Sequence, residues 1–141
     1  MRHLIGLGVL ELALLAGCSD PTVIGSDWHR LQPPRPAPPF SLSQLEGGRA
    51  QLADYHGQVV IMEFWATWCQ PCRFSLPSLE KIYREYRDRG VVLLLINEAE
   101  EPNVIRRWAA RRYTAPILLD RDGLVATQYH IDGIPALFII D

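Results

Sequence analysis

Residues 58–72 read Gln-Val-Val-Ile-Met-Glu-Phe-Trp-Ala-Thr-Trp-Cys-Gln-Pro-Cys, and this stretch decides the fold. Its first nine residues, 58–66, form a near-continuous apolar run, which is typical of a strand covered on both faces. Two cysteines, Cys69 and Cys72, follow, and apolar residues then recur at helical spacing as far as Tyr86. The stretch therefore predicts a central strand, a turn that carries the first cysteine, and an amphipathic helix.

The spacing of the two cysteines predicts a redox pair. The thiol of Cys69 would lie accessible at the N-terminus of the predicted helix, where free N–H groups and the helix dipole favour the thiolate. Cys72 lies one turn further and can close on it, so the pair can make and break a disulfide. A structural disulfide and half of a zinc site are the alternatives, but none of the four histidines forms a second spaced ligand pair. We expect no metal and no cofactor.

The rest of the chain alternates predicted strands and helices on both sides of this stretch. Residues 40–45 and 49–52 flank a turn at 46–48 and predict a hairpin. Further strands are expected at 91–96, 116–119 and 136–140, and helices at 102–112 and 124–129, while the helix after the cysteines should be kinked or restarted at Pro77 and closed by Gly90. This alternation predicts an α/β fold whose central mixed sheet has a parallel core, helices on its flanks and an N-terminal β-hairpin extension.

The N-terminus has the pattern of an export signal. Residues 1–17 combine a positive start with an apolar stretch that is shorter than the about 20 residues of a membrane-spanning helix. The segment Leu15-Ala16-Gly17-Cys18 resembles the lipobox of bacterial lipoproteins, which predicts lipidation of Cys18; an ordinary secretory signal with an incidental Cys18 is the alternative. Residues 18–38 hold five of the 11 prolines, Pro39 follows directly, and the stretch predicts an extended linker.

Composition limits the remaining possibilities. A chain of 141 residues with 48% hydrophobic and 21% charged residues fits one globular domain. Its formal net charge of −2 provides no cationic field for a row of phosphates, so we expect no nucleic-acid partner.

Two motifs together resemble a known family. Residues 64–72 are similar to the active-site segment of thioredoxin-like thiol-disulfide oxidoreductases, closest to the membrane-anchored TlpA/ResA type, and Pro77 matches the proline of the following helix. Gly133-Ile134-Pro135 resembles the cis-proline loop of that family. The resemblance implies a thioredoxin-like domain over 39–141, incomplete at its C-terminus because the family's last strand and helix are missing. It also implies that Trp68, Ile134 and Pro135 bind the substrate.

Glu63 is the third predicted catalytic residue. It lies inside the apolar strand, six residues before Cys69, and matches the buried aspartate that thioredoxins use to move the proton of the resolving cysteine. Burial raises the pKa of a carboxyl group, which suits a base for Cys72. TlpA-type sequences commonly carry a glutamate three residues after the second cysteine, where this chain has Ser75. Either Glu63 takes that role, or it is a tolerated, partly hydrated acid.

The function that these features predict is that of a membrane-tethered thiol-disulfide oxidoreductase. It would be lipid-anchored on the periplasmic side of a bacterial membrane and reduce protein disulfides, with the haem-binding cysteines of apocytochromes c as one substrate that the resemblance implies. Its expected partners are protein disulfides, a membrane thiol-disulfide electron donor, and the membrane itself through the anchor. Two alternatives stay open: a peroxiredoxin-like peroxide reductase, although Met62 and Ala66 stand where such sites have Pro and Thr, and an inactive, truncated binding module.

Overall fold

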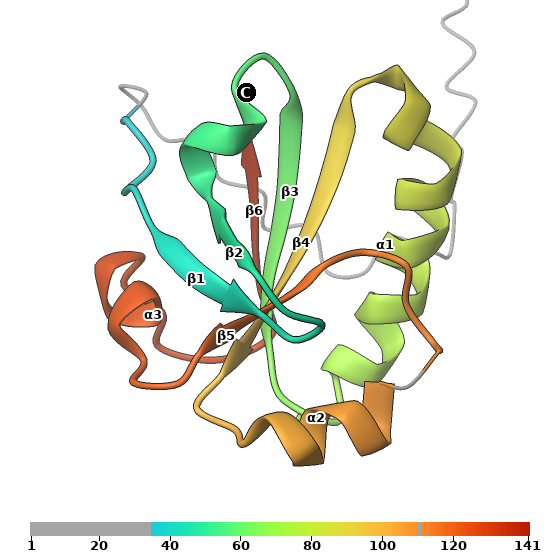
Figure 1. Ribbon diagram of the computed structural model, residues 1–141, viewed down its shortest axis with the longest axis vertical. Coiled ribbons are helices and arrows are strands. Elements are labelled where there is room, and N and C mark those ends of the chain that lie inside the picture. Colours follow the sequence, from blue (N-terminus) through green and yellow to red (C-terminus); the bar gives the residue numbers. More distant parts are fainter. Residues whose placement is uncertain (1–34, 110) are drawn as a thin grey trace, which may run out of the picture. The chain divides into compact units, whose positions relative to one another are not determined.

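A computed structural model describes residues 35–109 and 111–141, and within them a six-stranded mixed sheet carries helices on both faces (Figure 1). The strands are β1 (Ser41–Gln44), β2 (Arg49–Gln51), β3 (Val59–Trp65), β4 (Val91–Glu98), β5 (Ile117–Asp120) and β6 (Ala136–Ile140). The helices are α1 (Cys72–Tyr86), α2 (Pro102–Ala109) and α3 (Leu124–Gln128), with short 3-10 turns η1 (Leu52–Tyr55) and η2 (Arg87–Arg89). The predicted signal peptide and most of the predicted linker lie outside the described residues.

The strand order is β2-β1-β5-β4-β3-β6. Strands β3, β4 and β5 run parallel, whereas β1 is antiparallel to β5 and β6 is antiparallel to β3. The hairpin of β1 and β2 turns through Gly47 and Gly48, whose φ angles of 104° and 83° lie in the region that glycine adopts most easily. The predicted mixed sheet with a parallel core and an N-terminal hairpin is therefore confirmed.

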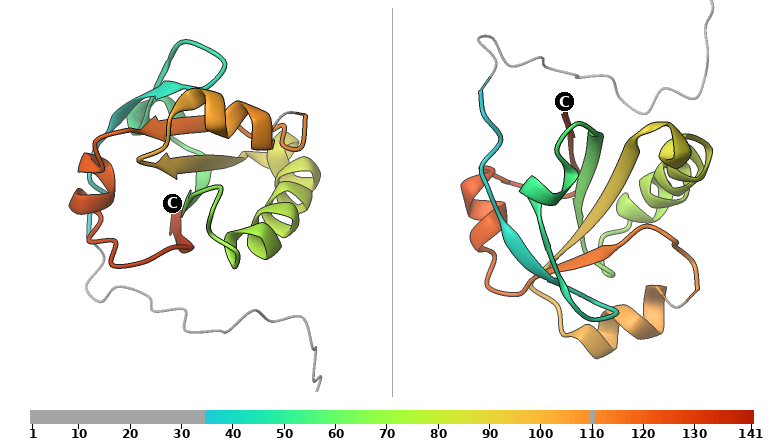
Figure 2. Two further views of the ribbon diagram at one scale, coloured as in Figure 1. Left: turned by 90° about the horizontal axis from the view of Figure 1, so that it is seen from below. Right: turned by 45° about the horizontal axis from the view of Figure 1, so that its top comes forward.

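Two hydrophobic cores lie on the two faces of the sheet, because successive side chains of a strand point to opposite faces. The α3-side core is built from alternate residues of β3 and β4 together with α3, and it includes Val60, Met62, Phe64, Leu94, Ile96, Val125 and Tyr129. The α1-side core contains the cysteines and includes Trp65, Cys69, Cys72, Leu76, Leu93, Leu95 and Ile105. Both views in Figure 2 place α1 and α3 on opposite sides of the central strands.

Helix α1 is continuous from Cys72 to Tyr86, so of the two alternatives expected at Pro77, a kink or a restart, the restart is excluded. Pro77 lies in the second turn, where its ring removes only the hydrogen bond to the carbonyl of Arg73. Burial of Leu76 and Leu79 against the sheet offsets that loss. The predicted end is confirmed, because Gly90 has a φ of 81° and closes the turn η2 that follows the helix.

Glu80 joins α1 to the segment before β5. Its buried carboxylate accepts hydrogen bonds from Thr114 N at 2.8 Å, from Thr114 Oγ1 at 2.6 Å and from Ala115 N at 3.3 Å, and it pairs with Arg84 at 2.8 Å. Burial alone would raise the pKa of Glu80, but these hydrogen bonds, those from Thr114 first, outweigh it and lower the pKa. The contact fixes α1 against the sheet.

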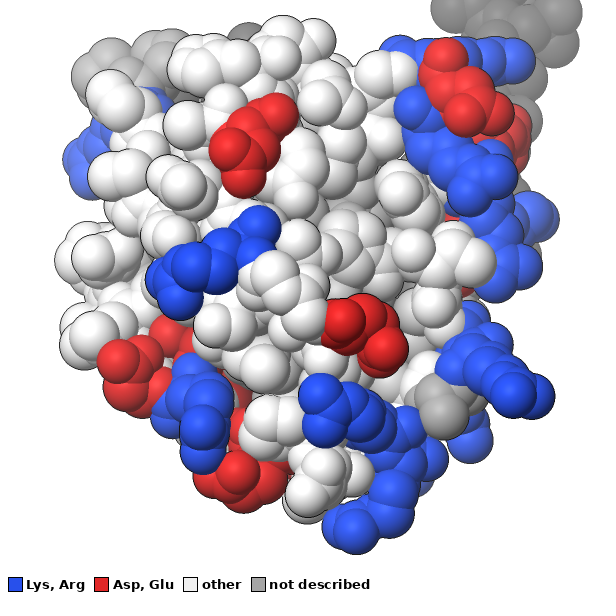
Figure 3. Space-filling model, in the orientation of Figure 1, with Lys and Arg blue, Asp and Glu red and all other residues white. Residues whose placement is uncertain are grey.

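Helix α2 is shorter than predicted. It ends at Ala109 rather than at residue 112, because Arg111 has a φ of 60° and a left-handed residue does not continue an α-helix. Arg106 and Arg107 still occupy its last turn, whereas Arg111 and Arg112 lie beyond it. In the view of Figure 3, basic side chains follow the edges formed by α1 and α2, with acidic side chains between them. None of the helices in the described part of the chain has the length and apolar character to cross a membrane.

Candidate active site

The two cysteines are joined by a disulfide at the start of α1. Strand β3 ends at Trp65, a short connection follows, and Cys72 is the first residue of the helix. The Cα atoms of Cys69 and Cys72 are 5.4 Å apart, and the backbone N–H of Cys72 donates to Sγ of Cys69 at 3.3 Å. Because that N–H belongs to the electropositive end of the helix, it would stabilise negative charge on the sulfur of Cys69 once the bond opens.

The disulfide itself is buried, and an exposed residue lies next to it. Cys72 is fully buried, and Cys69 is only 3% exposed, so the expectation of an accessible first thiol is wrong for the disulfide form. The reason is that both sulfurs pack into the α1-side core beside Leu76. Trp68, by contrast, is 69% exposed, and it lies directly next to Cys69. A partner that reaches the disulfide would therefore contact this indole ring.

The loop before β6 contains a cis peptide bond between Ile134 and Pro135, as the resemblance to thioredoxin-like proteins implies. Strand β6 pairs with β3 so that Ala136 lies opposite Phe64, which brings Pro135 to the end of β3 from which the cysteine segment continues. Ile134 is half-buried and packs against the core that contains both cysteines, whereas Pro135 is exposed. The structure thus brings this loop to the same end of the sheet as the cysteines.

Glu63 lies beneath α1 on the cysteine-bearing face of β3, and it is 1% exposed. Ser75 Oγ donates to Glu63 Oε1 at 2.5 Å and lies 3.2 Å from the carbonyl oxygen of Cys72. The second oxygen, Glu63 Oε2, has no hydrogen-bond partner among the described residues. Burial raises the pKa of Glu63 to about 7, and the hydrogen bond from Ser75 lowers it only in part.

The side chain of Ser75 stands where the sequence comparison expects the family's glutamate, and it touches the acid that the chain carries on β3 instead. The two positions are 12 residues apart in sequence and meet because α1 packs on β3. Glu63 thus places a carboxyl group beside residue 75, and it does so from β3 rather than from α1. Sequence reasoning noted both residues and did not find their contact.

A carboxylate that sequence reasoning missed also touches the active-site segment. Glu100 follows β4 and accepts two hydrogen bonds from Thr67, the second residue before Cys69. A signal for this contact exists, because the carboxyl ends of neighbouring parallel strands meet at one edge of a sheet. Predicting the contact from this rule would have required knowing that β3 and β4 are neighbours, and the sequence does not reveal the order of the strands.

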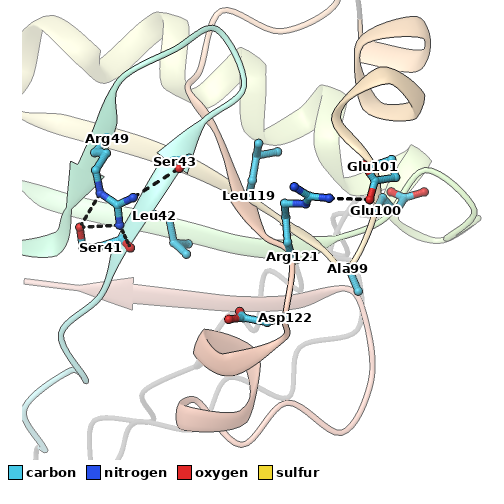
Figure 4. A pocket seen from close by; sticks show the side chains of 10 residues that line it. All are labelled: Ser41, Leu42, Ser43, Arg49, Ala99, Glu100, Glu101, Leu119, Arg121 and Asp122. Carbon is cyan, nitrogen blue, oxygen red and sulfur yellow. Dashed lines mark hydrogen bonds and ion pairs between the residues drawn. The ribbon is translucent and has the colours of Figure 1, made fainter.

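The surface pocket drawn in Figure 4 lies over β1, β5 and the β4–α2 connection, and neither cysteine lines it. Its two arginines already have partners, since Arg49 donates to the hydroxyls of Ser41 and Ser43 and Arg121 pairs with Glu101 at 2.6 Å. We therefore place the candidate active site at the disulfide. No group of three His, Cys, Asp or Glu side chains in residues 35–109 and 111–141 is arranged to hold a metal ion, and Cys18 lies outside these residues.

The chain is similar in sequence and in fold to known proteins. A family model described as the AhpC/TSA family matches residues 33–141. The thiol-disulfide oxidoreductase ResA of Geobacillus thermodenitrificans is 39% identical over 106 residues, which cover 74% of this chain and 61% of that protein. The thioredoxin-like protein YneN of Bacillus subtilis is 40% identical over 114 residues, covering 79% of this chain and 66% of YneN.

Solved structures show the same fold. The crystal structure of StoA from Bacillus subtilis superposes with a TM-score of 0.65 at 29% identity, covering 77% of this chain and 83% of StoA. The chain spans about three fifths of the length of the ResA relative, 61%.

Proposed function

This chain belongs to the AhpC/TSA family of thioredoxin-like proteins, and from that premise we propose that it is a thiol-disulfide oxidoreductase that reduces protein disulfides. One observation carries the proposal: Cys69 and Cys72 form a disulfide at the N-terminus of α1, with the N–H of Cys72 directed at Sγ of Cys69. Such an arrangement favours a thiolate at the first position and a second thiol within bonding distance of it.

The reaction is an exchange of disulfides in two steps. The thiolate of Cys69 attacks one sulfur of the substrate disulfide, the substrate S–S bond breaks, and the released substrate thiolate takes up a proton. Cys72 then loses its proton and attacks Sγ of Cys69, which releases the second substrate thiolate. Two electrons have passed to the substrate, and the Cys69–Cys72 disulfide has formed. A dithiol donor must reduce it again before the next cycle.

Glu63 is the proposed base for Cys72. Its pKa of about 7 allows it to accept a proton near neutral pH and to return it in the reverse step. Ser75 links the carboxyl group to the backbone of Cys72. When Glu63 is protonated, its O–H can donate to Ser75 Oγ, and the hydroxyl hydrogen of Ser75 is then free for the carbonyl of Cys72. The proton would thus stay next to Cys72, which takes it up again in the reverse step.

The substrate would bind across the exposed residues around the disulfide. Trp68 offers an open aromatic surface, and Ile134 and Pro135 approach from the loop before β6. We assign these three residues to substrate binding. Backbone pairing of the substrate with Ile134 would orient its disulfide toward Cys69.

The sequence supports a location outside the cytoplasm. An export signal at residues 1–17, lipidation of Cys18 and a proline-rich spacer at 18–38 would tether the domain 39–141 to a bacterial membrane on its periplasmic side. There a membrane thiol-disulfide protein would supply electrons. The haem-binding cysteines of apocytochromes c are the substrate that the ResA resemblance favours.

A trapping experiment tests the function directly. In Cys72→Ser, the mixed disulfide with Cys69 cannot be resolved, so we expect an oxidised peptide with the pattern Cys-x-x-Cys-His to remain covalently attached to Cys69. The control Cys69→Ser should capture nothing. Equal capture by both variants, or by neither, would contradict the proposal, and peroxide consumption that depends on Cys69 would favour the peroxidase alternative.

A further inference from the structure

The carboxylate of Glu100 collects three hydrogen bonds beside the active-site segment. Oε2 accepts from the backbone N–H of Thr67 at 2.7 Å and from Nδ2 of Asn97 at 2.7 Å, while Oε1 accepts from Thr67 Oγ1 at 2.5 Å. A carboxylate is an acceptor at both oxygens, whereas a glutamine in its place would offer one acceptor and one donor. A glutamine could keep these contacts only by accepting both N–H groups on its one oxygen while its NH2 donates to Thr67 Oγ1, whereas a methionine of similar length would lose all three.

Hydrogen bonds hold the backbone N–H, the hydroxyl and the carbonyl oxygen of Thr67. In addition to its two bonds to Glu100, its carbonyl oxygen accepts from Nη2 of Arg73 at 3.1 Å, and the residue is buried. The next residues along the chain are Trp68 and Cys69, and the N–H of Cys69 donates back to the carbonyl of Ala66 at 3.1 Å. Only one residue separates the fixed Thr67 from the reactive sulfur.

The backbone before Glu100 is held in an uncommon conformation. Ala99 has a φ of 56°, in the left-handed region that an L-residue adopts only under strain. Its N–H donates to the carbonyl of Asp120 on β5 at 3.0 Å, which keeps it there. Strain of this kind persists where the surrounding structure fixes it, and it is frequent at functional sites. Here it turns the chain immediately before the residue that holds Thr67.

We propose that Glu100 is a positioning residue for Cys69, because it fixes Thr67 and thereby keeps Sγ of Cys69 against the N–H of Cys72. This inference rests on the proposed function and deepens it. In the oxidised protein the disulfide itself also holds Cys69 in place. After reduction that covalent link is gone, and the hydrogen bonds of Thr67 to Glu100 remain to keep the sulfur at the helix N-terminus, where its thiolate is stabilised.

Position and charge make opposite predictions for the pKa of Cys69. Removing the negative charge of Glu100 would, by charge alone, favour the thiolate and lower that pKa. Releasing Thr67 would move the sulfur away from its donor and raise it. The other charged groups that these contacts place around the segment are Arg73 on α1 and Glu63 on β3, and neither is altered in the test.

The test measures alkylation of Cys69 by iodoacetamide as a function of pH in the reduced full-length chain, with the modified cysteine identified by peptide mass spectrometry. For Glu100→Met, which keeps the length of the side chain and removes both acceptors, we expect the pKa of Cys69 to rise by about half a unit to one unit, so that alkylation below the pKa slows about 3- to 10-fold. Thr67→Val, which loses one of the two bonds without a change of charge, should give a smaller rise, and Thr67→Ser should restore the wild-type profile.

Glu101→Gln is the matched control for charge. Glu101 is the neighbouring residue, is exposed, and pairs with Arg121, as Figure 4 shows. Removing its charge should leave the pKa of Cys69 unchanged or slightly lowered. An unchanged or lowered pKa in Glu100→Met as well would overturn the positioning role.

The same variants and the wild type also distinguish a failure of the Glu100 role from a failure of the proposed function. If Glu100→Met does not fold, the comparison of Thr67→Val with Thr67→Ser decides, and equal profiles for these two would overturn the proposal. If the wild-type cysteines do not join reversibly in glutathione buffers, the proposed function fails instead. A wild type that cycles normally, together with variants that match it, removes only the role of Glu100.

Discussion

The two faces of β3 bury very different side chains. Toward α3, the strand presents Met62 and Phe64, which are fully buried among apolar residues. Toward α1, it presents Glu63 and Trp65, which are equally buried but carry polar atoms. The strand therefore has one face that only packs and one face that also carries polar groups.

The α3-side face is closed by aromatic contacts. The ring centroid of Phe64 lies 5.7 Å from that of Tyr129 and 6.0 Å from that of Phe138, and the latter two are 5.2 Å apart. Contacts of this geometry add to the stabilisation from buried apolar area. Nothing in this cluster takes part in the proposed chemistry.

The α1-side face contains the polar atoms that lack partners. Among the described residues, three buried side-chain atoms have no hydrogen-bond partner: Glu63 Oε2, Trp65 Nε1 and Asn97 Oδ1. Asn97 is paired with Trp65 in the sheet and so lies on the same face. Such atoms cost stability. The difference between the faces teaches that both sides of the sheet gain stability from buried apolar residues, while the side where the cysteines react also accepts the cost of unpaired polar atoms.

The largest expected effect is that of Phe64→Ala. Removing a fully buried aromatic side chain should lower the free energy of unfolding by about 3–5 kcal/mol, measured by denaturant unfolding. The pH profile of Cys69 alkylation in the folded fraction should stay as in the wild type, because the ring lies on the other face. A changed profile would break the division between the two faces.

The pH dependence of stability sharpens the comparison for Glu63. Its pKa in the folded protein is about 7, against an ordinary 4.5, so the folded state binds more protons than the unfolded state between these values. Stability should therefore fall as pH rises from 4.5 to 7, by about 3 kcal/mol for this group, and its contribution should be constant above that range.

Glu63→Gln should remove this slope, while Glu46→Gln, at the exposed hairpin turn, should retain it. The measurement is denaturant unfolding at a series of pH values, and the quantity compared is the difference between each variant and the wild type. A slope that survives in Glu63→Gln would show that the acid is hydrated rather than buried.

The smallest expected effect is that of Trp65→Phe. The substitution removes the indole N–H that has no partner in the described part of the chain and leaves a smaller ring against Trp108, whose centroid lies 5.2 Å away. Removing the unpaired indole N–H should stabilise the fold by about 1–3 kcal/mol, and this gain should nearly offset the packing that is lost with the smaller ring. We expect a net change within about 1 kcal/mol by thermal unfolding, whereas Phe64→Leu, which removes no polar atom, should destabilise by more.

Much of the fold could be predicted because its signals are local. The apolar run at 58–66 predicted β3, and the helical spacing after Cys72 predicted α1. The end of α2 was missed, since the arginines up to residue 112 continue the charge pattern of a helix while the backbone at Arg111 has already left it. Residue type did not reveal that left-handed turn.

The candidate site, too, was predicted only in part. The cysteine pair was found from its spacing, whereas the cis-proline loop and the catalytic role of the buried acid were implied by the resemblance to thioredoxin-like proteins. Glu100 was not found, because its partner Thr67 is 33 residues away and the two meet only when β3 and β4 are neighbours.

By itself, the sequence determined the strand, the helix and the two sulfurs between them, because hydrophobic periodicity and a three-residue step act within a few residues of chain. Only the tertiary structure decided which polar groups surround those sulfurs. The contact of Ser75 with Glu63 required α1 to pack on β3, and the hold of Glu100 on Thr67 required two parallel strands to end at one edge. The partner of a buried polar atom depends on which elements become neighbours, and that is settled by the packing of the whole core.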